Sequence, residues 1–468
     1  MKPTETDTGR PKQSEQAEWQ RENENLRREN ERLRQENERL REQLEQALRA
    51  GKRQAAPFSR GEPKAKPKRP GRKPGQRYGQ HQRRKRPAQV EEIIAVPLPA
   101  QCPCGGAVEW ERNEPQYQED IVVQTVRRRF DIAIGHCRCC QKRIQGRDPR
   151  QTSDALGAAS VQIGPTALSL AALMNKQMGV SLGNAQRILE LGCGLKISRG
   201  GLSRALARMA AKAEPTYQQL LQQARQSLVN TMDETGWKVG GKLQWAHVAV
   251  GEWTTVYAIL AGRGYAQSQE LIGAGYNGFL VRDGWAPYRR FQEAFHQTCL
   301  GHLLRRCGEM EQASRGGKKF PQAVKKLLKK ALRLRDGHGS GRVSDGGLAS
   351  ERGKLEAAMD RLLQRRFGNA ANRKLQRHLE TERAYLFTFL YCPGLAATNH
   401  EAERAIRVLV MARKVWGGNR TATGARTQSV LMSVLRSCQQ QGKAPLPRLT
   451  KLLCSSPPVV LDVANNSS

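Results

Sequence analysis

Near the N-terminus, leucine recurs every seven residues, and asparagine follows two of these leucines by four positions. This repeat is typical of a coiled coil, in which buried asparagine pairs favour two parallel strands. Glutamate and arginine flank the seam, so charges that face each other between two parallel chains would be opposite. We predict a parallel dimeric coiled coil over residues 15–50, with a single solvated helix as the alternative. The predicted dimer contacts are Leu26, Asn30, Leu33, Asn37 and Leu40.

Between residues 151 and 215, apolar residues recur at helical spacing. Two helical segments flank the turn at 192–194, and Ser198 is a suitable N-cap for the second segment. This order predicts a helix–turn–helix-like DNA-binding region, whose second helix would contact bases in the major groove. An ordinary helical hairpin is the alternative. The predicted contact residues are Arg199, Ser203, Arg204 and Arg208.

Beyond Pro215 the apolar pattern changes to that of β-strands. Short turns between the first three segments predict an antiparallel meander. Asp233 follows the first segment and Asp283 follows the fourth. We therefore expect two carboxylates at the ends of neighbouring strands in an α/β fold. The predicted strands cover residues 227–232, 243–250, 254–260 and 279–282.

A third carboxylate is expected from the helical segment that begins near Asn399, with Glu403 one turn further along. Three carboxylates can hold two Mg²⁺ ions about 4 Å apart, which activate water or a 3′-hydroxyl group and stabilise the leaving oxygen in phosphoryl transfer. Each acid alone is better explained by a strand-end cap or a surface ion pair. Their order and basic surroundings together favour the metal site. The basic residues that would hold DNA there are Arg404, Arg407 and Lys414.

The net charge is +36, from 79 Lys or Arg against 43 Asp or Glu. This is too basic for an ordinary metabolic enzyme and favours nucleic acid or an anionic membrane surface as partner. The longest uncharged stretch, residues 155–175, contains several polar residues, so no membrane span is predicted. Residues 1–10 lack the apolar core of a secretory signal, so we expect a reducing cytoplasm and no disulfide framework among the 11 cysteines.

Residues 51–87 hold 14 Lys or Arg, one acid and several prolines. Such a composition cannot form a core. We predict a disordered DNA-binding linker over residues 51–90 that lies along a groove or phosphate backbone, with a merely solubilising linker as the alternative. The predicted DNA contacts are Arg69, Arg72 and Lys73.

Two close pairs of cysteines, 102/104 and 137/140, suit tetrahedral zinc. The segments 121–126 and 130–134 between them are predicted strands, so residues 91–150 would form a zinc-ribbon-like domain. Cys139 and His136 compete for one ligand position, and free buried thiols are the alternative. The predicted ligands of a structural Zn²⁺ are Cys102, Cys104, Cys137 and Cys140.

Four motifs stand out in the second half of the chain: Asp-Glu-Thr-Gly-Trp at 233–237, Asp-Gly-Trp-Ala-Pro-Tyr at 283–288, Cys-Leu-Gly-His-Leu-Leu-Arg-Arg at 299–306 and Asn-His-Glu-Ala-Glu-Arg at 399–404. With the zipper, basic stretch, cysteine segment and helical region before them, they resemble the insertion-sequence-66 family of bacterial DDE transposases over about residues 15–445. The resemblance implies a ribonuclease-H-like catalytic core that cuts transposon ends and joins their 3′-hydroxyls to target DNA, using two Mg²⁺ or Mn²⁺ ions.

The resemblance assigns Asp233, Asp283 and Glu403 to the metal-binding triad. Glu234 is the rival first acid and Glu401 the rival third acid. The chain departs from the family pattern at Cys102-Pro-Cys104, which is one residue tighter than usual, and at His400, where the family often has a second asparagine.

The 119 residues between the second and third acids predict a helical insertion at about 303–390 in a catalytic domain spanning 216–445. Within it, 318–335 reads as a basic amphipathic helix of the kind that also binds membrane surfaces, although the other modules favour DNA. Cys299 and His302 could ligate a metal but more readily pack near the active centre. Residues 446–468 are predicted to be a C-terminal tail, of which 455–468 would be loose.

The predicted architecture is thus an α/β multidomain protein in which the zipper, zinc segment and helical region precede the catalytic core. We expect it to act on double-stranded DNA, both transposon ends and target, as a homodimer or larger synaptic oligomer, associated with the bacterial nucleoid. Companion transposition proteins are common in the family. A non-catalytic DNA-binding regulator and a metal-dependent nuclease without strand transfer are the alternatives.

Overall fold

The computed structural model describes residues 21–22, 24–37, 39–40, 85–313 and 317–464, and it divides the chain into two compact units, 1–119 and 120–468. In the first unit, the described residues between 21 and 40 are helical, as the heptad pattern predicts. Their leucine stripe is exposed, and the Asn30 side-chain amide donates to the backbone oxygen of Leu26. Pairing of this helix with a second copy stays a prediction.

Several predicted features lie outside the described residues. These are the ends of the zipper, at 15–20 and 41–50, and the linker over 51–84 with Arg69, Arg72 and Lys73.

The second unit contains a short hairpin in which β1 (Ile134–His136) pairs antiparallel with β2 (Arg143–Gln145). The prediction of a strand over residues 121–126 is wrong, and the predicted strand 130–134 overlaps β1 only at Ile134. An apolar segment forms a strand where a neighbour takes its backbone hydrogen bonds and a core takes its side chains. Val122, for example, is 93% exposed.

A helical region follows, beginning with η1 (Gly157–Ala159) and α2 (Pro165–Ala172), which continues into the π-helical turn η2 (Leu173–Gln177). α3 (Leu182–Cys193) ends at Gly194, whose φ of 64° closes the helix in the left-handed conformation that glycine adopts most easily.

α4 (Arg199–Gln226) begins as the sequence predicts, with the Ser198 hydroxyl accepting a hydrogen bond from the Gly201 N–H. The helix is 28 residues long and runs through Pro215. The predicted domain boundary between residues 215 and 216 therefore falls inside one continuous helix. Its first half belongs to the helical region and its second half packs on the sheet.

The central sheet has the strand order β5-β4-β3-β6-β7. The first three strands of the sequence form the predicted antiparallel meander, while β6 and β7 run parallel to β3. Two details differ from the prediction. β3 continues through Asp233 instead of ending before it. β7 was not predicted, because His, Gln and Thr occupy its buried positions. The strands are β3 (Val229–Val239), β4 (Lys242–Val250), β5 (Thr255–Leu260), β6 (Phe279–Arg282) and β7 (Phe295–Thr298).

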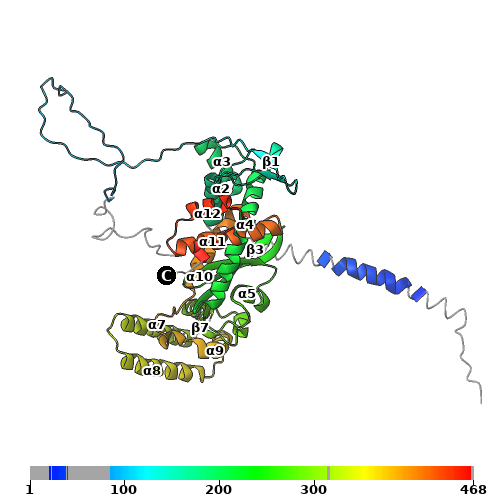
Figure 1. The fold of residues 1–468 in the computed structure, drawn as a ribbon. Coiled ribbons are helices and arrows are strands. Elements are labelled where there is room, and N and C mark those ends of the chain that lie inside the picture. Colours follow the sequence, from blue (N-terminus) through cyan, green and yellow to red (C-terminus); the bar gives the residue numbers. More distant parts are fainter. Residues whose placement is uncertain (1–20, 23, 38, 41–84, 314–316, 465–468) are drawn as a thin grey trace, which may run out of the picture. The chain divides into compact units, whose positions relative to one another are not determined.

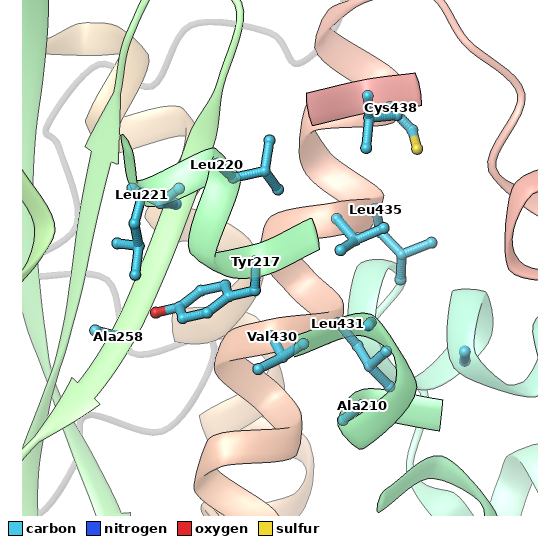
Figure 2. Close-up of a cluster of buried hydrophobic side chains, with 14 of the residues drawn as sticks. Ala210, Tyr217, Leu220, Leu221, Ala258, Val430, Leu431, Leu435 and Cys438 are labelled. Carbon is cyan, nitrogen blue, oxygen red and sulfur yellow. The ribbon is translucent and has the colours of Figure 1, made fainter. Parts of the chain in front are cut away.

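Helices cover both faces of the sheet. α10 (His400–Trp416) packs on one face, where its Leu409 joins a buried cluster with Trp237 and Val248. The second half of α4 packs on the other face against α11 (Ala422–Gln440) and β5, with α5 (Tyr265–Ile272) beside it. Figure 2 shows this second cluster, in which the Tyr217 ring of α4 points toward β5. The Tyr217 hydroxyl donates to the backbone oxygen of Tyr257 at 2.8 Å.

Three serines of α11 seal the free edge of β5. Ser429, Ser433 and Ser437 lie one helical turn apart, and their hydroxyls accept hydrogen bonds from the backbone N–H groups of alternate strand residues at 2.9–3.1 Å. Four helical residues advance about 6.0 Å and two strand residues about 6.7 Å, so the two repeats nearly match. An edge that would otherwise pair with another chain is thereby satisfied internally.

The predicted insertion is helical and has its own core. It contains α6 (Leu300–Ala313), α7 (Lys319–Gly339), α8 (Asp345–Leu363) and α9 (Ala370–Glu382), followed by the short turns η4 (Arg383–Tyr385) and η5 (Thr388–Leu390). α7 and α8 run side by side (Figure 1). Their leucines pack together with Leu300 and Leu303 of α6 in a cluster that reaches Val281 of β6.

The described part of the predicted C-terminal tail packs on the rest of the second unit, and the burial of Leu461 and Val463 contradicts the loose segment expected over 455–468. α12 (Pro445–Cys454) buries Leu449, Leu452 and Leu453, the spacing of an amphipathic helix. Leu461, just before η6 (Asp462–Ala464), is also buried and donates its N–H to the Thr216 hydroxyl of α4. None of the helices in the described residues combines the length and apolar composition that a membrane span requires.

We expect Ser433→Ala to lower the free energy of unfolding by about 1–3 kcal/mol, because the Tyr257 N–H would be buried without an acceptor. The control is Thr423→Ala on an exposed position of the same helix, which should change stability by less than about 0.5 kcal/mol. Urea unfolding of both variants tests this, and equal stabilities would show that the serine contacts contribute nothing.

Candidate active site

Two of the predicted acids follow neighbouring parallel strands in register. Thr231 of β3 pairs with Val281 of β6. Two residues further along each strand stand Asp233 and Asp283, and adjacent strands lie about 4.8 Å apart, so the register brings the two acids abreast. Asp283 comes directly after β6, where its carboxylate accepts the Trp285 N–H at 2.9 Å and turns the chain.

The third acid comes from the first turn of α10. Asn399, the residue before this helix, is fully buried and donates its side-chain amide to the Met232 oxygen at 3.3 Å. Met232 immediately precedes Asp233, so this bond ties the start of α10 to the strand that carries the first acid. The Glu403 N–H donates to the Asn399 oxygen at 3.0 Å, and the Glu403 carboxylate lies 3.5 Å from Nε2 of His302 on α6.

The electrostatics of Asp233 link all three acids. The pKa of Asp233 is raised to about 7, mainly by burial and further by the negative charges of Glu234, Asp283 and Glu403, while the hydrogen bond from the Glu234 N–H lowers it. A carboxylate responds in this way when other carboxylates are near and few cations compensate them. β6 and α10 thus bring Asp283 and Glu403 within electrostatic reach of Asp233 on β3.

The two rival acids have different surroundings. Glu234 accepts hydrogen bonds from Arg263 at 3.0 Å and from the Tyr288 hydroxyl at 2.5 Å, and its side chain is almost fully buried. Arg263 is itself stacked between Trp245 and Trp285. Glu234 is therefore held as the partner of a fixed cation. Glu401 is exposed on α10.

A buried ion pair braces the second acid from the insertion. Arg282, the last residue of β6, pairs with Glu382 at the end of α9, and both side chains are fully buried. Thr298 and Arg289 also donate to Glu382, at 2.6 and 2.8 Å. The Arg282 guanidinium then donates to the backbone oxygen of Asp283 at 3.0 Å. Glu382 of the insertion therefore holds Arg282, and Arg282 in turn holds the backbone of Asp283.

The pKa of Glu382 reflects this arrangement. Burial acts to raise it, but the charge of Arg282 and the hydrogen bonds from Thr298 and Arg282 outweigh burial and hold it below its ordinary value. Glu382 is therefore ionised at neutral pH and can pair with both Arg282 and Arg289.

Comparison with known proteins identifies the family. A family model described as Transposase IS66 family matches residues 160–427, more than half of the chain. The chain belongs to the IS66 family of transposases. No curated protein matches it. The IS66 match runs from just before α2 into α11 and includes all three acids, the helix–turn–helix-like region and the insertion.

Asp233, Asp283 and Glu403, here called the acid centre of this IS66 transposase, carry carboxylate oxygens of the type that divalent cations bind. Among the described residues, no group of three or more His, Cys, Asp or Glu side chains is arranged to hold a metal ion. Two observations nevertheless fit such an ion. Burial and the neighbouring acids raise the pKa of Asp233, and a bound cation would lower it. The buried atoms Oδ1 of Asn399 and Nδ1 of His302 have no partner in the described part of the chain. The oxygen-rich donors suit Mg²⁺ or Mn²⁺.

Each cysteine pair lies in a turn of its own unit. In the first unit, the Cys102 N–H donates to the Gly106 oxygen, and hydrogen bonds from the Gly106 backbone and the Cys102 side chain lower the pKa of Cys104. In the second unit, the β1–β2 turn holds Cys137, whose pKa is lowered by the backbone N–H groups of Cys140 and Cys139. Such N–H groups favour the thiolates that zinc requires. A shared zinc ion stays a prediction, as does the choice between Cys140, Cys139 and His136.

Among the described residues, those predicted to contact DNA lie on the surface of two helices. On α4, Arg199, Ser203, Arg204 and Arg208 are exposed along the first three turns. On α10, Arg404, Arg407 and Lys414 are exposed, from the residue directly after Glu403 to about three turns beyond it. These positions are available to a phosphate backbone.

Sequence reasoning missed the residues that hold the acids in place. Arg263 and Tyr288 fix Glu234, and the Arg282–Glu382 pair joins positions 100 residues apart. Cys299 was expected near the active centre, and it is buried beside the Asn399 backbone. The only signals available were an arginine inside a short apolar strand and a glutamate at the end of an amphipathic helix.

We expect Glu382→Ala to lower the free energy of unfolding by about 3–5 kcal/mol, because Arg282 would remain buried without its anion. Glu380→Ala, at an exposed position of the same helix, is the control and should change stability by less than about 0.5 kcal/mol. Chemical unfolding of the two variants measures the difference. A Glu382→Ala protein as stable as the control would contradict the bracing role.

Proposed function

We propose that this IS66-family transposase cuts DNA at transposon ends and joins the resulting 3′-hydroxyls to target DNA, with Asp233, Asp283 and Glu403 holding divalent cations. The observation that carries the proposal is the convergence of these three acids at the β3–β6–α10 junction, where Asp283 and Glu403 both contribute to the raised pKa of Asp233. The strand order, three antiparallel strands followed by two parallel to the first, supports the ribonuclease-H-like core that this chemistry uses in the family.

The roles of the residues follow from their contacts. Asp233, Asp283 and Glu403 would hold two Mg²⁺ or Mn²⁺ ions; when bound, such ions activate water or a 3′-hydroxyl and stabilise the leaving oxygen of phosphoryl transfer. Asn399 positions the first and third acids relative to each other, because it bonds to the backbone before Asp233 and to the Glu403 N–H. Glu234 keeps Arg263 in place and stays out of the donor set.

The remaining modules are proposed to bring DNA and a second protein copy to this centre. The exposed arginines of α4 would read or position the terminal repeats, and those of α10 would neutralise phosphates beside the reacting bond. The basic linker would add salt-sensitive affinity, the leucine zipper would join two copies, and zinc would stabilise the cysteine segment. The protein would work on the nucleoid, with or without companion proteins.

A strand-transfer assay with pre-cut 3′-hydroxyl ends and Mg²⁺ tests the proposal. Wild-type protein should give joined products, and Asp283→Asn should reduce their yield about a thousandfold or more, since several kcal/mol of transition-state stabilisation are lost. Binding of the same DNA, measured by fluorescence anisotropy, should stay within about twofold, because this variant removes a charge that repels phosphate.

The matched control is Glu401→Gln, which removes one exposed acid of α10 and should retain joining activity. Nicked but unjoined DNA would instead favour a nuclease. Undiminished activity of Asp283→Asn would remove this acid from the centre, and DNA binding with no metal-dependent chemistry in the wild type would favour a regulator.

A further inference from the structure

The helical insertion carries a disproportionate share of the positive charge. Residues 300–390 contain 21 Lys or Arg against 9 Asp or Glu, a net charge of +12 in 91 residues, compared with +36 in the whole chain of 468. Per residue the insertion is nearly twice as basic as the chain. A bracing role toward Asp283 does not require this charge, so the insertion surface needs a separate explanation.

Four of the 21 basic residues of the insertion line one groove between α6 and α7. The groove has a volume of about 280 Å³. Its only acid, Glu311 of α6, is paired with Lys325 at 2.8 Å and with Gln322 at 2.7 Å. We call it the α6–α7 groove. Its lining residues are Glu311, Gln322, Lys325, Lys326, Lys329 and Arg333.

Three cations of this groove are exposed and uncompensated. In the part of the chain that the structure describes, Lys326, Lys329 and Arg333 have no carboxylate within 4 Å, whereas Lys330 on the same helix is paired with Glu351. Steps of three and four residues place the three cations on one side of α7. They span about 10 Å along the helix axis, the length over which one strand of duplex DNA presents about three phosphates.

The buried side of α7 identifies the kind of polyanion. Phe320, Val324, Leu328 and Ala331 are buried in the core of the insertion. A helix binds a membrane surface by inserting its apolar side among lipid chains. The apolar side of α7 is buried against α6 and α8, so only its charged side is exposed. This charged side suits a hydrated phosphate backbone.

α6 connects the groove to the acid centre. Its residue His302 contacts Glu403, and its Glu311 lines the groove nine residues further on, about 14 Å along the helix. Arg305 and Arg306 lie between these two points on α6. A duplex that follows α6 from the acids would therefore reach the groove after about four base pairs.

We propose that the α6–α7 groove binds the phosphate backbone of duplex DNA, beginning about four base pairs from the reacting phosphate. The inference rests on the proposed function only in taking the acid centre as the place where DNA reacts. It makes the insertion a second DNA-holding surface, separate from α4 and α10, and it does not depend on DNA sequence because the contacts are to phosphates.

The test compares two triple variants of the full-length chain that lose the same charge. One is Lys326→Gln/Lys329→Gln/Arg333→Gln in the groove; the control is Arg361→Gln/Arg365→Gln/Lys374→Gln, which neutralises exposed cations of the insertion outside the groove lining. Affinity is measured by fluorescence anisotropy between 50 and 200 mM salt, on duplexes whose length on either side of the transposon end increases in two-base-pair steps.

On long duplexes the groove variant should lose about three units of the slope of log affinity against log salt concentration and at least about tenfold in affinity at 0.1 M salt. These losses of affinity and salt slope should disappear when, on one side of the reacting phosphate, the duplex is no longer than about four base pairs. Whether that side belongs to the element or to the target tells which DNA the groove holds.

Equal losses in the control variant would overturn the proposal, as would a loss independent of duplex length or no loss at all. Binding of wild-type protein, but not of the groove variant, to phosphatidylserine vesicles would assign the groove to membranes and overturn it too. Because the assay needs no catalysis, it stays informative if strand transfer fails, and that failure would count against the proposed function alone.

Discussion

The arrangement of this protein depends on holding carboxylates together that repel one another. Burial and the charges of its neighbours raise the pKa of Asp233 to about 7, which is a free-energy cost to the folded protein at neutral pH. Elements distant in the sequence offset this cost. The β3–β6 register sets the first two acids abreast, and Asn399 anchors the helix of the third acid to the backbone beside the first.

Contacts between distant parts of the chain also mean that the surrounding helices are not independent domains. α4 begins in the helical region after residue 156 and ends under the sheet, so one continuous helix belongs to both. The insertion reaches back through Glu382 to the residue before Asp283, and α11 closes the sheet edge with its serines. The surfaces proposed to bind DNA and the acid centre are thus parts of one packed body in the second unit.

The sequence was sufficient to predict features that depend on local pattern. Alternation and turns predicted four strands, the N-cap preference predicted the start of α4 at Ser198, and helical spacing predicted that Glu403 lies on a helix. It was insufficient where a feature depends on partners far along the chain. β7 is a strand although three of its four residues are polar, because Thr298 and Gln297 find buried partners contributed by residues 382–389. The segment around Leu449 was predicted to be part of a tail. It forms a helix because its leucines are buried against α2 and α4.

The central claim is that Asp233, Asp283 and Glu403 together form one site for divalent cations. Isothermal titration calorimetry of Mn²⁺ into full-length protein already saturated with zinc tests it most directly. Wild type and Glu401→Gln should show the same saturable binding, and Asp233→Asn, Asp283→Asn and Glu403→Gln should each weaken it strongly while remaining folded. Undiminished Mn²⁺ binding in any one of these three variants would show that its acid lies outside the site.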